Sequence, residues 1–207
     1  MTITARHDQD VKRIGAPMQR VMIIGQPGSG KSTLAREMGA HTGLPVVHID
    51  TIHWQPGWVE RSSDEKTRLC LEVEARDQWI FEGGHSTTWN NRIARADLLV
   101  WIDRSSLLRF WRVLLRTLIQ RGRTRPDLPE NCPEKLGNLP EFYRFMWTTR
   151  QSARANMKRF AASAPPTCRV VCLRSNRQTR LFLSSIEQAS CIVSSRKDPV
   201  PKTPLRD

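Results

Sequence analysis

Long apolar runs are missing from this 207-residue sequence. No stretch reaches the roughly 18 consecutive apolar residues that a membrane-spanning helix needs, so we expect no membrane span. The first twenty residues also lack the apolar central region of a secretory signal peptide. These absences predict a cytoplasmic protein without a membrane partner.

Cysteine pairs with metal-binding spacing are missing as well. The chain has five cysteines and no C-x-x-C motif, and Cys168 and Cys172 lie within an apolar, strand-like run. An odd number of cysteines in a cytoplasmic chain indicates buried thiols, because disulfide frameworks and zinc sites use paired or clustered cysteines. We therefore predict neither a disulfide nor a zinc site.

Acidic residues are few compared with basic ones. The chain has 33 lysines and arginines against 20 aspartates and glutamates, which gives a net charge of +13, and no lysine-rich block concentrates that charge. Such a balance suits nucleic acid, an acidic membrane surface or a polyphosphate ligand. A basic chain with solvated helix faces is an equally good interpretation, so nucleic acid is only a weakly supported partner.

Short apolar segments alternate with amphipathic ones along the chain. Five apolar segments are typical of buried parallel strands: residues 20–25, 45–50, 78–84, 97–103 and 168–175. Helical patterns follow them at residues 31–43, 62–77, 105–123, 141–162 and 177–189, the third with arginines on its polar face. This alternation predicts an α/β fold with a five-stranded parallel sheet flanked by helices. Ligands of such folds bind at the carboxyl ends of the strands.

The stretch GQPGSGKST, from Gly25 to Thr33, has the form G-x-x-x-x-G-K-[ST] between a predicted strand and a predicted helix. This context is typical of a Walker A phosphate-binding loop, in which backbone N–H groups and the helix dipole bind phosphate oxygens. We expect Lys31 to reach the β- and γ-phosphates of ATP and the Ser32 hydroxyl to bind Mg²⁺. The predicted nucleotide-binding residues of the loop are Gly25, Gly28, Ser29, Gly30, Lys31, Ser32 and Thr33.

Candidate substrate-binding residues follow the second and third predicted strands. Asp50 ends the second strand, where it binds a substrate group or water-bound Mg²⁺, or else caps a turn. His53 and Trp54 follow in the stretch HWQPGW, whose aromatic side chains either form a pocket wall or fix the loop to the core. Both interpretations stay open. Gly83 and Gly84, after the third strand, allow a substrate to approach the backbone closely.

Two acids compete for the magnesium role. Glu82 ends the third predicted strand and is also placed to act as a general base near the γ-phosphate. Asp103 ends the fourth strand after the apolar run LLVWI, as a Walker B acid does. The carboxylate on the strand beside the phosphate loop should serve the metal. The sequence does not show which strand that is, so both acids remain candidates.

A proline-rich segment with arginines, about residues 121–138, separates two predicted helices. We predict that it is a lid that closes over the nucleotide and excludes water, the alternative being a solvated basic loop. Arginines held near the γ-phosphate stabilise the charge of the migrating phosphoryl group. Arg123, Arg125 and Arg150 are the candidates for this role, together with Lys31. Glu82, as general base or metal ligand, completes the predicted catalytic set.

The chain resembles the small P-loop kinases of the adenylate and shikimate kinase type, and among them the bacterial DNA topology modulation (FlaR-type) proteins. The similar stretches are VMIIGQPGSGKSTLAR, PVVHIDTIHWQPGWVE, WIFEGGHS, ADLLVWID, RGRTRPDLPENCPEKL and VVCLRS, within residues 19–189. Relatives more often have Asp-Gly-Asn-Tyr where this chain has Glu-Gly-Gly-His at residues 82–85. This departure affects the metal geometry, because glutamate reaches farther than aspartate.

The resemblance implies a P-loop NTPase fold with strand order 2-3-1-4-5, a small substrate-binding insertion after strand two and an arginine-bearing lid. It implies that strand three, ending at Glu82, lies beside the phosphate loop. It also implies that the adenine lies near the lid arginines, Arg121 among them, and near Ser175 and Arg177.

Together these features predict a monomeric kinase that uses ATP and Mg²⁺ and transfers the γ-phosphate to a small-molecule or nucleotide acceptor. Two alternatives stay open: a nucleotide-dependent regulator of DNA topology, which the net charge favours, and a slow nucleoside triphosphatase. The predicted kinase domain comprises residues 19–189, between a flexible extension (residues 1–18) and a disordered, basic, proline-rich tail (residues 190–207). The native start is either Met1 or Met18.

Overall fold

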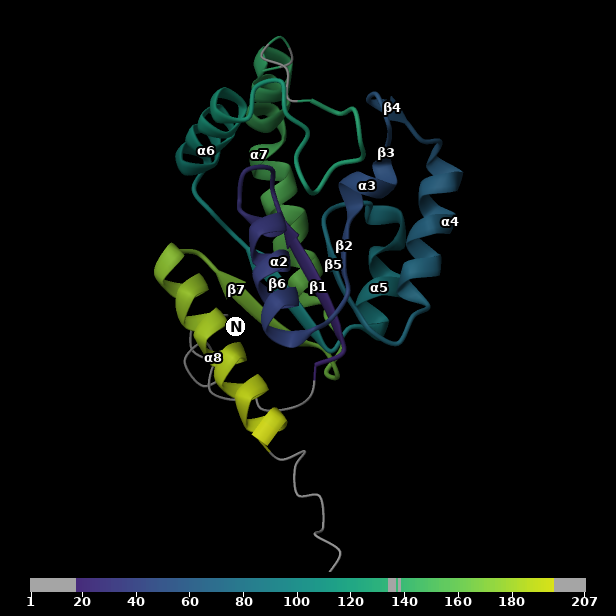
Figure 1. The fold of residues 1–207 in the computed structure, drawn as a ribbon, viewed down its shortest axis with the longest axis vertical. Helices are drawn as coiled ribbons and strands as arrows, with labels where there is room; N and C mark the ends of the chain where they lie inside the picture. Colours follow the sequence, from purple (N-terminus) through teal and green to yellow (C-terminus); the bar gives the residue numbers. More distant parts are fainter. Residues whose placement is uncertain (1–17, 134–136, 138, 196–207) are drawn as a thin grey trace, which may run out of the picture.

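A five-stranded parallel sheet forms the centre of the protein in a computed structural model that describes residues 18–133, 137 and 139–195 (Figure 1). Its strands are β1 (Arg20–Gly25), β2 (Val46–His48), β5 (Trp79–Glu82), β6 (Leu98–Ile102) and β7 (Arg169–Leu173). Their order in the sheet is β2-β5-β1-β6-β7. Counted along the chain without the two strands outside this sheet, the order is the 2-3-1-4-5 that the resemblance implied.

Helices and one small hairpin connect these strands. The helices are α2 (Lys31–Thr42), α3 (Ile49–His53), α4 (Ser63–Glu74), α5 (Trp89–Arg95), α6 (Ser106–Ile119), α7 (Leu139–Ala162) and α8 (Asn176–Ser195), with a 3₁₀ turn at Ser86–Thr88. The two-residue strands β3 (Trp54–Gln55) and β4 (Val59–Glu60) form an antiparallel hairpin outside the main sheet. No helix in the described part of the chain is long and apolar enough to cross a membrane.

The predicted domain limits stay predictions. Helix α8 continues to Ser195, past the predicted start of the tail at residue 190. The predicted extension up to residue 17 and the predicted tail from residue 196 lie outside the described residues, as do residues 134–136 and 138 of the predicted lid.

The side chains of β1 alternate between two apolar layers. Val21 and Ile23 pack with residues of α2 and α8 on one face of the sheet. Met22 and Ile24 pack with residues of α4, α5 and α7 on the other face. All four side chains are inaccessible to solvent. Burial on both faces explains the continuous apolar run of this strand and fixes its carboxyl end, where the phosphate loop begins.

The second strand is shorter than the sequence predicts. β2 ends at His48, and the chain turns at once into α3, with Asp50 in the first turn of that helix. Thr51 Oγ1 donates a hydrogen bond to the His48 carbonyl at 2.7 Å, which supports the turn. The prediction that Asp50 ends the strand is therefore wrong by two residues. A short apolar run does not by itself distinguish a strand from a strand followed by one helical turn.

Candidate functional site

A cavity of about 1020 Å³ opens at the carboxyl end of the sheet, beside the start of α2. Six of the predicted nucleotide-binding residues line it: Gly28, Ser29, Gly30, Lys31, Ser32 and Thr33. Asp50, Trp54 and Arg125 line the same cavity. The structure therefore brings the predicted phosphate loop, two predicted substrate residues and one predicted lid arginine to one place. The volume lies at the upper end of the range for ligand sites, about 300–1,000 Å³.

Helix α2 begins in the phosphate loop without a side-chain cap. Its N-cap residue, Gly30, has a left-handed φ of 98°, and no side chain bonds to the first N–H groups. Gly28 also has a positive φ, 74°, and a Cβ atom there would lie 2.6 Å from the carbonyl oxygen of Arg109 in α6. Uncapped N–H groups at the positive end of a helix dipole form an anion-binding site.

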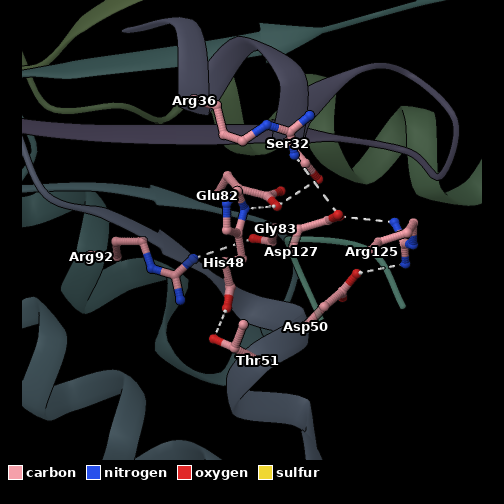
Figure 2. A network of polar contacts seen from close by, with 10 residues as sticks. All are labelled: Ser32, Arg36, His48, Asp50, Thr51, Glu82, Gly83, Arg92, Arg125 and Asp127. Carbon is pink, nitrogen blue, oxygen red and sulfur yellow. Dashed lines mark hydrogen bonds and ion pairs between the residues drawn. The ribbon is translucent and has the colours of Figure 1, made fainter. Parts of the chain in front are cut away.

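Glu82 lies directly behind Ser32 in a buried hydrogen-bond network (Figure 2). Its Oε1 accepts a hydrogen bond from Ser32 Oγ at 2.9 Å and lies 2.8 Å from His48 Nδ1. Burial opposes the charge of Glu82, but the hydrogen bond from His48 and the charge of Lys31 outweigh it and lower the pKa of Glu82. Glu82 is therefore ionised at neutral pH, with an oxygen beside the Ser32 hydroxyl.

Two members of this network, His48 and Asp127, are not among the residues predicted from the sequence. Asp127 is 3% exposed and accepts a hydrogen bond from Arg125 Nη1 at 2.8 Å. Burial opposes its charge, but the charge of Arg125 and a hydrogen bond from Ser32 lower the pKa of Asp127. Both residues had a signal in the sequence. His48 interrupts an otherwise apolar strand, and Asp127 follows two residues after a predicted lid arginine.

Asp50 faces the cavity from α3. Its Oδ2 lies 3.8 Å from Arg125 Nη2, and 40% of its side chain is exposed. Burial of the carboxylate among the cavity walls, and then the negative charge of Glu82, raise the pKa of Asp50. A carboxylate with a raised pKa is a better proton acceptor than an exposed aspartate at the same pH.

The oxygens around Ser32 fit Mg²⁺. Ser32, Glu82 and Asp127 offer hydroxyl and carboxylate oxygens, the hard ligands that this ion prefers. The described residues contain no group of three or more histidines, cysteines, aspartates or glutamates arranged to hold a metal. Mg²⁺ needs no such cage, because it keeps several waters and is usually held by one or two carboxylates together with substrate phosphates.

Asp103, the competing metal candidate, has a different environment. β5 and β6 both pair with β1, so adjacency to the phosphate-loop strand does not choose between Glu82 and Asp103. The neighbours of the two side chains differ more clearly. Asp103 accepts hydrogen bonds from Arg154 Nε and Nη2, both at 2.8 Å, whereas Glu82 accepts one from the Ser32 hydroxyl of the phosphate loop at 2.9 Å. The geometry favours Glu82 for the metal.

Helix α6 turns its arginines inward. Arg109 is 2% exposed, and Arg112 and Arg116 line the cavity, whereas Leu107 and Trp111 are 80% and 56% exposed. An ordinary surface helix has the opposite arrangement, with its apolar side chains toward the core. The arginines of this helix therefore contribute positive charge to the cavity and are not a solvated surface.

Trp54 and Trp58 match both interpretations of the HWQPGW stretch. They line the cavity edge to face, with ring centroids 5.2 Å apart. Trp58 also holds the loop of residues 120–133 in place: its backbone N–H donates to Cys132 Sγ at 3.3 Å and its Nε1 to the Pro133 carbonyl at 3.0 Å. Both tryptophans therefore form part of the cavity wall, and Trp58 also fixes the HWQPGW stretch to the loop of residues 120–133.

Several predicted residues lie near the cavity without lining it. Arg121 and Arg123 are exposed in the loop after α6, and Arg150 stacks on Trp147. Ser175, just before α8, and Arg177, in its first turn, do not line the cavity, whereas Asn176, Thr179 and Arg180 of α8 do. Other non-lining residues are Gly25, which ends β1, His53, which packs against Trp54, Glu82, which lies behind Ser32, and Gly83 and Gly84, which follow β5. The functional roles of all these residues stay predictions.

Of the two glycines after β5, only Gly83 is required by packing. It has a φ of 110°, and a Cβ atom there would lie 2.0 Å from Ile49 Cγ2. A Cβ at Gly84 would have nothing within 4 Å.

We expect Gly83→Ala to lower the free energy of unfolding by about 1–3 kcal/mol. Gly84→Ala should change it by less than about 0.5 kcal/mol in a urea titration. Equal losses in the two variants would contradict this packing.

The sheet order, the glycine loop and the helix after it define a P-loop NTPase fold. Comparison with protein-family models gave no match, and comparison with curated proteins gave none either. Among solved structures, the chain is similar to a shikimate kinase from Bacteroides thetaiotaomicron, at 15% identity and a TM-score of 0.50, over 86% of this chain and 99% of that one. A shikimate kinase from Acinetobacter baumannii in complex with shikimate matches at 14% identity and a TM-score of 0.49, over 91% and 99% of the two chains. At such identities the similarity shows the fold, which is that of shikimate kinase-like P-loop proteins.

Proposed function

We propose that this protein is a phosphotransferase that moves the γ-phosphate of ATP to a hydroxyl group of a small acceptor, with Mg²⁺ as its cofactor. The observation that carries the proposal is one cavity with two kinds of wall. Lys31 and Ser32 of the phosphate loop line it together with Asp50 and Trp54, which belong to a separate part of the chain. A site for nucleotide alone does not need this second set of side chains.

Each wall has a chemical role in the proposed reaction. Lys31 and the free N–H groups at the start of α2 bind the β- and γ-phosphates. Mg²⁺ held by Ser32 and Glu82 would neutralise charge on the phosphate oxygens. The acceptor oxygen attacks the γ-phosphorus and loses its proton to the Asp50 carboxylate. The bond between the γ-phosphorus and the bridging oxygen breaks, and ADP leaves with its electron pair.

The positive charge of the chain supports polyphosphate binding better than DNA binding. Seven cations line the cavity: Lys31, Arg36, Arg104, Arg112, Arg116, Arg125 and Arg180. Cations gathered around one cavity suit a compact polyphosphate better than the extended backbone of a duplex. The DNA topology alternative therefore loses part of the charge on which it rested.

Transfer of label from γ-labelled ATP to pooled alcohols tests the proposal. Label in an organic product, dependent on one acceptor, is the expected result. Label released only as inorganic phosphate, at the same rate with and without acceptors, would indicate a slow triphosphatase. Binding of duplex DNA that persists at moderate salt and changes with ATP would indicate the regulator, because phosphate-backbone binding weakens steeply with salt.

Asp50→Asn is expected to slow transfer by about a hundredfold, because proton transfer to a positioned group contributes about 10²–10⁴-fold to a rate. The affinity for ATP should stay the same. Asp50 must be ionised to accept the proton, and its pKa is raised. The rate of the unmodified protein should therefore fall as the pH drops through that raised value, and the asparagine variant should lose this part of the profile.

The control for this variant is Asp64→Asn, at an exposed position in the first turn of α4. Its rate and pH profile should match those of the unmodified protein. An unchanged kcat in Asp50→Asn would remove Asp50 from the reaction.

A further inference from the structure

The two sides of the cavity differ in how their cations are partnered. Figure 1 shows α6 and α8 on one side of α2, and α3 with the β3–β4 hairpin on the other. On the α6 and α8 side, Arg112 donates to the Ser29 carbonyl at 3.2 Å and to Asn176 Oδ1 at 2.8 Å. Arg104 donates to Thr179 Oγ1 at 2.5 Å. These partners are neutral, so they leave the charge of both arginines available for phosphates. We name this the donor side.

On the other side, the acceptor side, the cations are paired with carboxylates (Figure 2). Arg125 lies 2.8 Å from Asp127 Oδ2 and 3.8 Å from Asp50 Oδ2. Arg36 lies 3.8 Å from Asp127 Oδ1. The acceptor side thus has at least as many acids as cations, and an anionic ligand would have to displace an existing ion pair.

An aromatic corner completes the acceptor side. The rings of Trp54 and Trp58 meet at 80°, and His53 packs against Trp54 with centroids 4.6 Å apart. The bonds from Trp58 to Cys132 and Pro133 hold the corner against the loop of residues 120–133. Perpendicular aromatic faces bind apolar ring faces, and they also attract cations through the ring quadrupole.

Resting on the proposed function, we infer that the acceptor is a ring-bearing alcohol without phosphate or carboxylate groups. Its ring lies in the corner of Trp54 and Trp58, and the reacting hydroxyl points to Asp50. Sugars, amino sugars and nucleosides belong to this class. Nucleoside monophosphates and sugar acids do not, since the acceptor-side arginines are already neutralised by Asp50 and Asp127.

The experiment compares matched pairs of acceptors that differ in one anionic group. The pairs are adenosine with adenosine monophosphate, glucose with glucuronate, and glucosamine with glucosamine 6-phosphate, each with γ-labelled ATP and Mg²⁺. We expect a non-anionic member to be phosphorylated with a kcat/KM at least about tenfold higher than its anionic partner, because like charges brought together weaken binding.

The outcomes separate the two proposals. A preference for the anionic member in every pair that reacts would overturn the inference and leave the phosphotransferase intact. Label transfer to no acceptor, neutral or anionic, although ATP binds, would overturn the proposed function and the inference with it.

Two variants test the named side chains. Trp54→Leu should raise the KM for the reacting acceptor about tenfold and leave the KM for ATP unchanged. A tenfold change corresponds to about 1.4 kcal/mol, the size of one aromatic contact. Trp111→Leu is the matched control, because Trp111 is exposed on the outer face of α6. Asp127→Asn should raise the ratio of anionic to neutral acceptor use, since it removes a carboxylate partner of Arg36 and Arg125. An unchanged ratio would contradict the charge argument.

Discussion

Lys31→Ala is expected to slow phosphate transfer about a thousandfold, the upper range for removing one donor that stabilises transition-state charge. Lys31 lies in the phosphate loop at the first position of α2 and lines the cavity. Lys31 is the only lysine among the described residues that line the cavity. In the proposed reaction, Lys31 is the point charge that accompanies the γ-phosphate during transfer.

Lys66→Ala is the matched control for this variant. Lys66 pairs with Glu60 at 2.8 Å and does not line the cavity. Initial rates of both variants at saturating acceptor, over a range of ATP concentrations, separate lost binding from lost catalysis. A rate for Lys31→Ala within tenfold of the unmodified protein would show that the glycine loop does not hold the reacting phosphate.

The second large effect concerns stability. Glu74 and Arg92 form an ion pair with both side chains fully buried, Arg92 Nε to Glu74 Oε1 at 2.9 Å. The guanidinium lies 3.6 Å from the centre of the Phe81 ring and also donates to the Gly83 carbonyl at 3.3 Å. Arg92→Met leaves the Glu74 charge buried without this partner. We expect it to lower the free energy of unfolding by about 3–5 kcal/mol.

A double-mutant cycle distinguishes the pair from simple loss of packing. Glu74→Leu alone should destabilise by a similar amount, and the double variant should recover most of the loss, because a buried pair replaced by apolar residues is often neutral. The exposed pair of Arg68 and Glu72 is the control: Arg68→Met should change stability by less than about 0.5 kcal/mol. Urea unfolding followed by circular dichroism measures all four variants. Additive losses at Glu74 and Arg92 would show that the two side chains are not coupled.

The strands and the phosphate loop could be predicted from the sequence because their signals are local. Apolar, β-branched segments predict buried strands, and the glycine, lysine and serine spacing of residues 25–33 predicts a phosphate loop by itself. The sheet order came from the resemblance. The structure confirms it in the pairing of β1 with β5 and with β6.

The rest of the site depends on contacts between residues that are far apart in the sequence. The periodicity of apolar residues along the chain does not predict such contacts. Glu82 is favoured over Asp103 for the metal by their partners, Ser32 for one and Arg154 for the other. Asp127 enters the site only because the loop of residues 120–133 folds back over α2. The inward arginines of α6 reverse the usual amphipathic rule, since the helix covers a cavity and not an apolar core. Local sequence patterns report none of these long-range relations.

The sheet order also has a consequence during synthesis. The central strand, β1, is the first to leave the ribosome, yet its two partners are residues 79–82 and 98–102. Until those segments emerge, this mostly apolar strand has two unpaired edges. Unpaired apolar edges are sites of aggregation for nascent chains. The nascent chain is therefore most in need of a chaperone while residues 26–102 are being synthesised. Slow translation of that segment should reduce the yield of folded protein more than slow translation after residue 102.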